Sequence, residues 1–320
     1  MFARPRRSVL YMPGSNAKAL AKAATLPADA LILDLEDSVA PDTKELARAQ
    51  VMEAVKGDFG GREVVIRVNG QHTPWGPDDL IAAAAAGPDA VLLPKVEYAG
   101  AIMLAARVLR ENGAPERTRV WAMMETPSAI LNAGQIAAVA ADSASRLAVL
   151  VMGLNDLAKE TRARLTPGRP TMISWLANCV VAARAHHVDL IDGVFNDIRD
   201  LDGFKAECLQ GRDLGLDGKT LIHPSQIDIC NEVFAPTEGE IESARAIIDA
   251  FALPENAGRG VIQLNGKMVE LLHADMARRT LAIADAIAGS LLRAYGEKSL
   301  PLAQGPGAAA PRRSPQATFR

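Results

Sequence analysis

One apolar stretch of the chain ends in a cluster of acidic residues. The segment LILDLEDSVAPD (31–42) begins like a buried strand and then places Asp34, Glu36 and Asp37 close together, with Asp42 shortly after. Carboxylates this close repel one another unless a proton or a nearby cation relieves the charge. The segment therefore indicates a site that holds a metal ion, basic side chains, or both.

Polar residues also end or follow the other apolar runs of the chain. They are residues 13–16, Arg67 and Asn69, Lys95 and Glu97, Glu125, residues 153–156, Asn196 and Asp197, and His223. Ordinary solvated loops explain any one of these positions, but eight such ends together favour a functional site. Arg67 and Lys95 are the cations that could offset part of the acidic charge.

The type of ligand indicates which metal to expect. The sequence holds no His or Cys cluster with the spacing of a zinc site. A few carboxylate and amide oxygens suit Mg²⁺, or Mn²⁺, which keeps water ligands and takes others from the substrate. Glu125 and Asp156 end the fifth and sixth apolar runs. We therefore expect both carboxylates to reach one ion.

The apolar runs are predicted to be strands of a parallel sheet, because nearly every residue in them is apolar and such strands are covered on both faces. The expected strands are residues 7–12, 28–33, 63–68, 89–93, 119–124, 146–152, 190–195 and 219–223. Helical patterns follow them at 16–25, 43–56, 77–86, 99–112, 127–141, 171–187, 201–215 and 225–234. Eight such repeats predict an α/β fold, a (β/α)8 TIM barrel with its site at the C-terminal strand ends. A doubly wound sheet is the alternative, because periodicity does not show closure.

The chain is expected to have three parts. Residues 1–235 form the barrel, which we take as the catalytic domain. Residues 236–296 form a C-terminal extension with a helix at 237–252, a strand or arm at 258–265 and a long helix at 268–292. The last part, 297–320, is rich in Pro, Gly and Ala and is expected to be disordered.

Composition excludes several classes of partner. The net charge of −3 and the 4% aromatic content give no basis for binding nucleic acid. No apolar run reaches the roughly 18 residues of a membrane span, and the N-terminus does not resemble a signal peptide. The three cysteines, Cys179, Cys208 and Cys230, lie far apart without metal spacing. We expect them to be small buried residues of a cytoplasmic protein.

Three weaker signals favour structural roles. His223 ends the eighth strand, and a hydrogen-bonding role is preferred there over that of a general base. His186 and His187 are expected to cap a helix at the surface. The segment Gly218-Lys-Thr220 is not a phosphate-binding loop, because the first glycine of that motif would fall at Asp213.

Seven segments together resemble a known family. They are RSVLYMPGSNAKALAKA, LDLEDSVAPDTKELAR, IRVNG, LLPKVE, METPSAIL, GLNDLAKE and GKTLIHPSQI, in that order along the chain. The chain is similar to the citrate lyase β-subunit (CitE-like) family, which includes malyl-CoA and citramalyl-CoA lyases, in the wider HpcH/HpaI aldolase group. The resemblance extends from Arg7 to Leu292.

The resemblance implies a magnesium-dependent TIM barrel that acts on short CoA thioesters and forms a homotrimer or a hexamer. It implies that Glu125 and Asp156 bind the metal and that Arg67 binds the substrate carboxylate; we add Asn155 to the substrate site. The CoA contacts of the family match a longer set of positions, which comprises Tyr11, Asn16, Lys22, Ile222, His223 and Pro224.

The C-terminal segment departs from the family pattern. Family lyases carry an Asp there that reaches a neighbouring subunit's site, followed by a proline. This chain has Gly266-Lys-Met-Val-Glu270, with Glu in place of Asp and without the proline. We therefore expect the extension to act as a lid on a neighbouring subunit and to supply Glu270 in trans.

These assignments lead to an expected reaction. A 3-hydroxyacyl-CoA such as citramalyl-CoA or malyl-CoA is cleaved reversibly to acetyl-CoA and a 2-oxoacid, pyruvate or glyoxylate. Arg67 offsets enolate charge, Glu270 moves a proton at the acetyl carbon, and Glu36 and Asp37 hold metal-bound water. A malyl-CoA-type thioesterase, a citrate lyase β-subunit acting on a carrier-bound acyl group and a non-catalytic metabolite sensor remain as alternatives.

Overall fold

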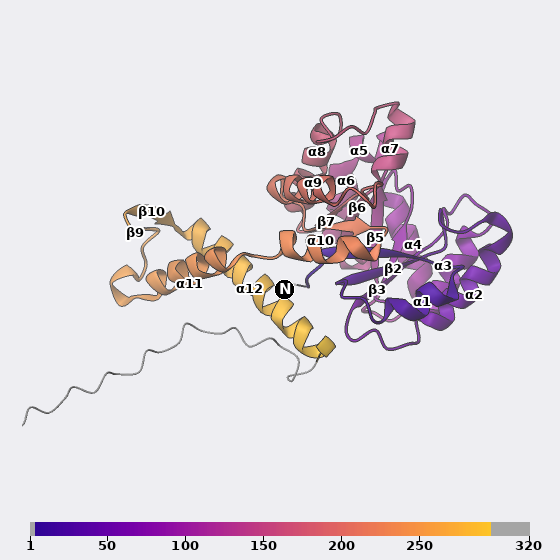
Figure 1. Ribbon diagram of the computed structural model, residues 1–320, viewed down its shortest axis with the longest axis horizontal. Helices are drawn as coiled ribbons and strands as arrows, with labels where there is room; N and C mark the ends of the chain where they lie inside the picture. The colour runs from indigo at the N-terminus through magenta and orange to yellow at the C-terminus, as the bar shows by residue number, and fades with distance from the viewer. Residues whose placement is uncertain (1–3, 296–320) are drawn as a thin grey trace, which may run out of the picture.

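The computed structural model describes residues 4–295 and shows eight parallel strands that close into a barrel (Figure 1). The strands follow one another around the barrel, and β1 pairs with both β2 and β8. They are β1 (Ser8–Pro13), β2 (Ala30–Asp34), β3 (Glu63–Arg67), β4 (Ala90–Leu93), β5 (Arg119–Met124), β6 (Leu147–Met152), β7 (Asp189–Asp192) and β8 (Gly218–Leu221). The predicted (β/α)8 barrel is confirmed, and closure excludes the doubly wound sheet.

Apolar side chains fill both sides of the barrel wall. One buried cluster fills the interior and includes Val9, Ile32, Val65, Leu92 and Trp121. A larger cluster lies between the strands and the surrounding helices. Burial on both faces explains why the strands are continuous apolar runs and do not alternate with polar residues. It also explains why their predicted bounds agree closely with the structure.

Helices surround the barrel and account for most of the predicted helical ranges. They are α1 (Ala17–Ala23), α2 (Lys44–Ala54), α3 (Gly76–Ala86), α4 (Ala99–Glu111), α5 (Pro127–Leu131), α6 (Ala133–Ala138), α7 (Leu154–Thr161), α8 (Ile173–Ala185), α9 (Leu201–Leu214) and α10 (Ile227–Phe234). The single helix predicted for 127–141 is wrong, because the chain breaks at Asn132 into α5 and α6. Helix α7 was not predicted; its first residues were expected to be a loop.

The C-terminal extension forms a separate projection beside the barrel (Figure 1). It contains α11 (Glu238–Ala252), β9 (Val261–Leu264), β10 (Lys267–Glu270) and α12 (Leu271–Tyr295). Ala250, Ile262 and Val269 form a small apolar core between α11 and the β9–β10 hairpin. The helix predicted for 268–292 therefore begins later than expected, because residues 267–270 pair with β9. The tail predicted to be disordered, 297–320, lies outside the described residues.

Salt bridges connect the beginnings of several strands at the N-terminal end of the barrel. Arg6, just before β1, pairs with Glu63 at 2.6 Å and with Asp189, which begin β3 and β7. Its guanidinium lies 5.5 Å from the ring centre of Trp121. These contacts join β1, β3 and β7 under the apolar interior.

Two further expectations concern the chain as a whole. Cys179, Cys208 and Cys230 are free and buried, as predicted. Over residues 4–295, every helix is too short or too polar to cross a membrane.

Candidate active site

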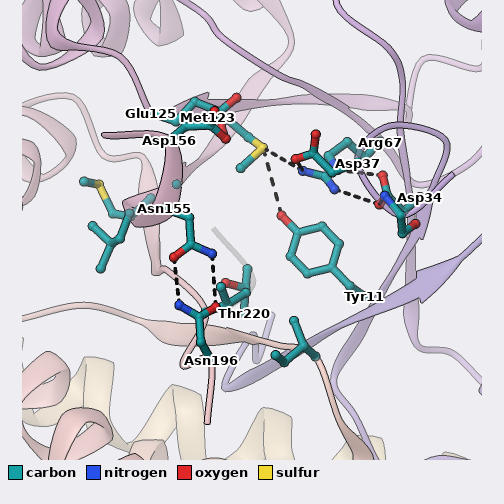
Figure 2. Close-up of a pocket in the computed structure, with 16 residues that line it drawn as sticks. Tyr11, Asp34, Asp37, Arg67, Met123, Glu125, Asn155, Asp156, Asn196 and Thr220 are labelled. Atoms are coloured by element: carbon teal, nitrogen blue, oxygen red, sulfur yellow. Dashed lines mark hydrogen bonds and ion pairs between the residues drawn. The ribbon is translucent and has the colours of Figure 1, made fainter. Parts of the chain in front are cut away.

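The C-terminal ends of the strands surround a cavity of about 300 Å³ (Figure 2). Its lining comprises Tyr11, Asp34, Asp37, Ser38, Arg67, Met123, Glu125, Met152, Gly153, Leu154, Asn155, Asp156, Val194, Asn196, Thr220 and Ile222. The structure therefore brings together polar residues in or just after seven of the eight strands, as the position of active sites in this fold predicts. All four residues expected in the metal and substrate sites are among them: Arg67, Glu125, Asn155 and Asp156.

Arg67 is held in place by Asp34. Its Nε and Nη2 donate to the two carboxylate oxygens of Asp34 at 2.6 and 2.7 Å. The third nitrogen, Nη1, lies 3.0 Å from Glu36 and 3.4 Å from Asp37. The guanidinium also lies over the ring of Tyr11, 4.7 Å from its centre. Both side chains of the Arg67–Asp34 pair are almost fully buried, so the direction of the guanidinium is fixed before any substrate enters.

Asp34 also shapes the acidic loop that follows β2. Its carboxylate accepts hydrogen bonds from the backbone N–H groups of Glu36 and Ser38 at 2.9 and 3.2 Å. Burial alone would raise the pKa of Asp34, but the Arg67 guanidinium and these hydrogen bonds hold it below its usual value. Asp34 is therefore the anion that braces the loop, which answers why the strand ends in acids.

The ionised form of Glu36 is less well stabilised than that of Asp34. Burial raises the pKa of Glu36 to about 8; Arg67 opposes this rise, and the neighbouring carboxylates Asp37 and Glu125 add to it. Its Oε2 has no hydrogen-bond partner among the described residues, although Arg67 Nη1 lies nearby. This carboxyl group can thus take up or release a proton close to neutral pH.

A buried lysine fixes the same loop from behind. Lys44 Nζ donates to the carbonyl oxygens of Leu35 and Glu36 at 2.8 Å and to Asn69 Oδ1 at 2.7 Å. The ammonium also lies 5.3 Å from the ring centre of Trp75. All three of its donors are used, so the loop backbone is rigidly placed. Sequence reasoning missed Lys44, which lies in a helix and follows no strand.

Glu125 and Asp156 lie on neighbouring elements and share one partner. The backbone N–H of Lys95 donates to Glu125 Oε1 at 2.7 Å, and Lys95 Nζ lies 3.2 Å from Asp156 Oδ1. Burial raises the pKa of Glu125 to about 7, although Lys95 lowers it. Gly153 leaves the space for this carboxylate, because a Cβ at position 153 would lie 2.5 Å from Glu125 Oε2.

These two carboxylates fit a divalent cation with few protein ligands. Among residues 4–295 no cluster of three or more His, Cys, Asp or Glu side chains has a metal-binding arrangement. Glu125 is nevertheless buried with a raised pKa, and Glu36 nearby has a raised pKa as well. A hard cation would relieve this excess of negative charge, and water would complete its coordination.

Two asparagines form a bridge at the side of the cavity (Figure 2). Asn155 Nδ2 donates to Asn196 Oδ1 at 3.1 Å, and Asn196 Nδ2 donates to Asn155 Oδ1 at 2.8 Å. Asn155, predicted to bind substrate, therefore lines the cavity but is paired with a side chain from the end of β7. Sequence reasoning noted Asn196 as a strand-end residue without giving it a role.

The residues predicted to contact CoA fall into two groups. Tyr11 and Ile222 line the cavity. The other four have structural positions: Asn16 caps α1 through Ala19 N, Lys22 lies in the last turn of α1, and His223 and Pro224 begin a 3-10 turn (Pro224–Gln226). His223 Nδ1 accepts from Ser225 N at 3.2 Å, which agrees with the predicted hydrogen-bonding role.

Glu270 lies away from the cavity of its own chain. It ends β10 in the projecting extension, and its backbone N–H donates to His273 Nδ1 at 2.9 Å (Figure 1). It is not among the residues that line the cavity. The same chain therefore does not bring Glu270 together with Arg67, Glu125 and Asp156.

Comparisons with known proteins agree with this architecture. Residues 7–224 match the family model described as HpcH/HpaI aldolase/citrate lyase. The chain is 49% identical over 287 residues to a (3S)-malyl-CoA thioesterase of Cereibacter sphaeroides strain ATCC 17029, covering 89% of this chain and 97% of that protein. It is 35% identical over 288 residues to citrate lyase subunit beta of Escherichia coli K12, covering 88% and 94% respectively.

Solved structures give the same result. The protein CitE of Mycobacterium tuberculosis, in complex with magnesium, acetoacetate and coenzyme A, is 28% identical with a TM-score of 0.72. That match covers 89% of this chain and all of the other. A citrate lyase beta subunit of M. tuberculosis with oxaloacetate and magnesium is also 28% identical, with a TM-score of 0.63 over 73% of this chain and 98% of the other.

Proposed function

Because the chain belongs to the HpcH/HpaI aldolase/citrate lyase family, we propose that it is a magnesium-dependent enzyme acting on a short hydroxyacyl-CoA thioester. The observation that carries the proposal is the position of Arg67, Glu125 and Asp156 around one cavity at the C-terminal mouth of the barrel. A cation site beside a fixed guanidinium suits a substrate that carries both a carboxylate and a polar acyl oxygen.

Hydrolysis of a malyl-CoA-type thioester is the first candidate reaction. It is supported by the identity to (3S)-malyl-CoA thioesterases along nearly their whole length. Water adds to the thioester carbonyl carbon, the carbon–sulfur bond breaks, and the CoA sulfur leaves and takes up a proton. The products are the free hydroxyacid and CoA.

Carbon–carbon cleavage, the reaction expected from the sequence, is the second candidate. It is supported by the identity to citrate lyase beta subunits and by related CitE structures with pyruvate and acetoacetate. In this reaction the substrate hydroxyl loses its proton and becomes the keto group of a 2-oxoacid. The acetyl-CoA carbon released by the broken bond takes up a proton.

The metal belongs with Glu125 and Asp156 in either reaction. Mg²⁺, or Mn²⁺, bound there supplies a Lewis acid that polarises a substrate oxygen. Glu125 and Asp156 hold it from two adjacent elements, and Gly153 leaves Glu125 the room to do so. The amide pair of Asn155 and Asn196 borders the same space and orients the acyl part of the substrate.

Arg67 binds the substrate carboxylate through Nη1, the nitrogen that Asp34 leaves free. Asp34 prevents the guanidinium from rotating, so little rotational freedom is lost when substrate binds. Glu36, with a pKa of about 8, is placed to exchange a proton with a substrate oxygen or with water near Arg67. Asp37 lies at the rim of the same cavity and orders water there.

The remaining assignments complete the proposal. Tyr11 and Ile222 contact the acyl end of CoA, whereas Asn16, Lys22, His223 and Pro224 contact it farther out. The extension (236–296) covers the site of a neighbouring copy in a homotrimer or hexamer and supplies Glu270 there. The free buried cysteines suit a reducing compartment such as the cytoplasm.

Product analysis tests the proposal and separates its two reactions. The full chain is incubated with Mg²⁺ and malyl-, citramalyl- and hydroxyglutaryl-CoA, and the products are identified by mass spectrometry. Free hydroxyacid with CoA supports the thioesterase; a 2-oxoacid with acetyl-CoA supports the lyase. Glu125→Gln is the matched control and is expected to lose turnover with either set of products. If the wild-type protein turns over none of these thioesters, the proposal is wrong.

A further inference from the structure

Lys95 joins the two carboxylates of the proposed metal site through two different groups. Its backbone N–H donates to Glu125 Oε1 at 2.7 Å, and its ammonium lies 3.2 Å from Asp156 Oδ1. The residue follows β4, whereas Glu125 follows β5 and Asp156 lies in α7. A single residue thus holds together side chains from two other parts of the barrel.

The backbone of Lys95 shows that these contacts are specifically maintained. Its φ of 49° places it in the left-handed region, which is unfavourable for a residue with a Cβ. Such a conformation persists where the surrounding contacts hold it, and it is frequent at functional sites. In this conformation the backbone N–H of Lys95 donates to Glu125 and its ammonium reaches Asp156.

The positive charge of the Lys95 ammonium also matters for the proposed metal site. The other cation at this mouth, Arg67, is paired with Asp34 and Glu36. Lys95 places its positive charge next to Asp156. A divalent cation on Asp156 would lie close to this ammonium, and like charges at such short range repel strongly in a partly buried site.

We propose that Lys95 is the internal counter-ion of the metal-free site and that the divalent cation displaces its ammonium from Asp156. The inference rests on the proposed function for the existence of the metal site. The backbone N–H of Lys95 continues to hold Glu125 during the exchange, so the site stays assembled with and without metal. Lys95 is thus a positioning residue whose side chain and backbone have separate tasks.

Metal affinity of the full chain tests the exchange. In Lys95→Gln the backbone contact to Glu125 is retained, but the competing charge is removed. Mn²⁺ titrated into the metal-free protein and followed calorimetrically is expected to bind Lys95→Gln about 5-fold more tightly than wild type. Mg²⁺ is likewise expected to raise the Tm of the variant by more than that of wild type.

Lys56→Gln is the matched control for a change of one charge. Lys56 is exposed and pairs with the exposed Glu53, away from the cavity. The affinity of the Lys56→Gln protein for Mn²⁺ should therefore equal that of wild type. Equal or weaker Mn²⁺ binding by Lys95→Gln overturns the inference and leaves the proposed function intact. Absence of Mn²⁺ binding by the wild-type protein overturns both.

Amine labelling of the wild-type protein gives an independent test without a variant. Acetylation of Lys95 by acetic anhydride is measured by mass spectrometry with and without Mg²⁺, with Lys56 as the internal reference. Displacement of the ammonium predicts several-fold faster labelling of Lys95 when Mg²⁺ is present. Equal or slower labelling in Mg²⁺ contradicts displacement.

Discussion

The two ends of the barrel are built on the same chemical unit. At the N-terminal end, Arg6 pairs with Glu63 and Asp189 and lies over Trp121. At the C-terminal end, Arg67 pairs most closely with two acids, Asp34 and Glu36, more loosely with the exposed Asp37, and lies over Tyr11. Each end therefore combines one buried arginine, two acids and one aromatic ring.

The ends differ in what surrounds this unit. At the N-terminal end a second arginine, Arg4, also reaches Glu63, at 3.5 Å, so two cations face the two acids of the unit. At the C-terminal end Asp37, Glu125 and Asp156 add further negative charge around an open cavity. Burial raises the pKa of Glu36 to about 8 and that of Glu125 to about 7 there. The same motif thus joins strands at one end, and at the other it lies beside an excess of negative charge that the proposed cation would offset.

Of the substitutions proposed here, replacement of Arg67 is expected to have the largest effect on activity and stability. Arg67→Met should lower kcat/KM for the thioester by about 10³, because a fixed cation at the reacting group is lost. It should also reduce stability, because Asp34 remains buried without its partner. Steady-state kinetics and thermal unfolding measure the two effects. Arg67→Lys restores the charge without the bidentate geometry, and wild-type kinetics in this variant would show that the geometry does not matter.

The same substitution at the other end should affect stability alone. Arg6→Met leaves the buried Glu63 with Arg4 alone and removes the partner of the half-buried Asp189, so it should lower the free energy of unfolding by about 1–3 kcal/mol. Denaturant unfolding measures this loss. The kcat/KM of the folded protein should stay within about 2-fold of wild type, because Arg6 lies at the end of the barrel opposite the cavity. A large loss of activity in folded Arg6→Met would remove the distinction between the two ends.

A single methyl group should disturb the cation site by a smaller amount. Gly153→Ala places a Cβ 2.5 Å from Glu125 Oε2, so the carboxylate must move. Affinity for Mn²⁺ and kcat/KM are expected to fall by about 10-fold, with about 1–3 kcal/mol of stability lost. Gly134→Ala is the control, because a Cβ there meets nothing within 4 Å. Unchanged Mn²⁺ affinity in Gly153→Ala would contradict the position assigned to Glu125.

The smallest expected effect is a pH dependence that arises at the C-terminal end. Between its unfolded pKa of about 4.3 and its folded pKa of about 8, Glu36 binds more protons in the folded state than in the unfolded state. Stability should therefore fall as pH rises through this range.

This dependence is measured by denaturant unfolding at pH 7 and pH 8 in metal-free buffer. The fall in stability should be smaller in Glu36→Gln, by on the order of 1 kcal/mol. An identical pH dependence in wild type and Glu36→Gln would show that Glu36 does not titrate in this range.

The fold could be predicted from the sequence more completely than the site. Continuous apolar runs gave the eight strands because both of their faces are buried. Strand β9 falls within the strand or arm predicted at 258–265, but its partner β10 was missed, although the sequence Asn265-Gly266 is typical of a two-residue hairpin turn and both residues have positive φ. Helix α7 was missed because its polar first turn resembles a loop.

The site required the three-dimensional structure for a different reason. The sequence identified the acids and the cations, but it could not show that Arg67 pairs bidentately with Asp34 and only partly with Glu36 and Asp37. Lys44 was missed because two of its three acceptors are backbone carbonyl oxygens, which no residue type reveals. Partner choice among nearby charges depends on distances that spacing along the chain does not encode.

The placement of aromatic rings beside the two ends gives the protein a natural optical readout. The protein has three tryptophans. Trp121 lies beside Arg6 at the N-terminal end of the barrel, and Trp75 lies beside Lys44 behind the acidic loop. Trp175 lies in α8, against the outer apolar cluster. With Trp175 replaced by Phe, emission would arise from Trp75 and Trp121 alone and would report on the surroundings of Lys44 behind the acidic loop and of Arg6 at the N-terminal end.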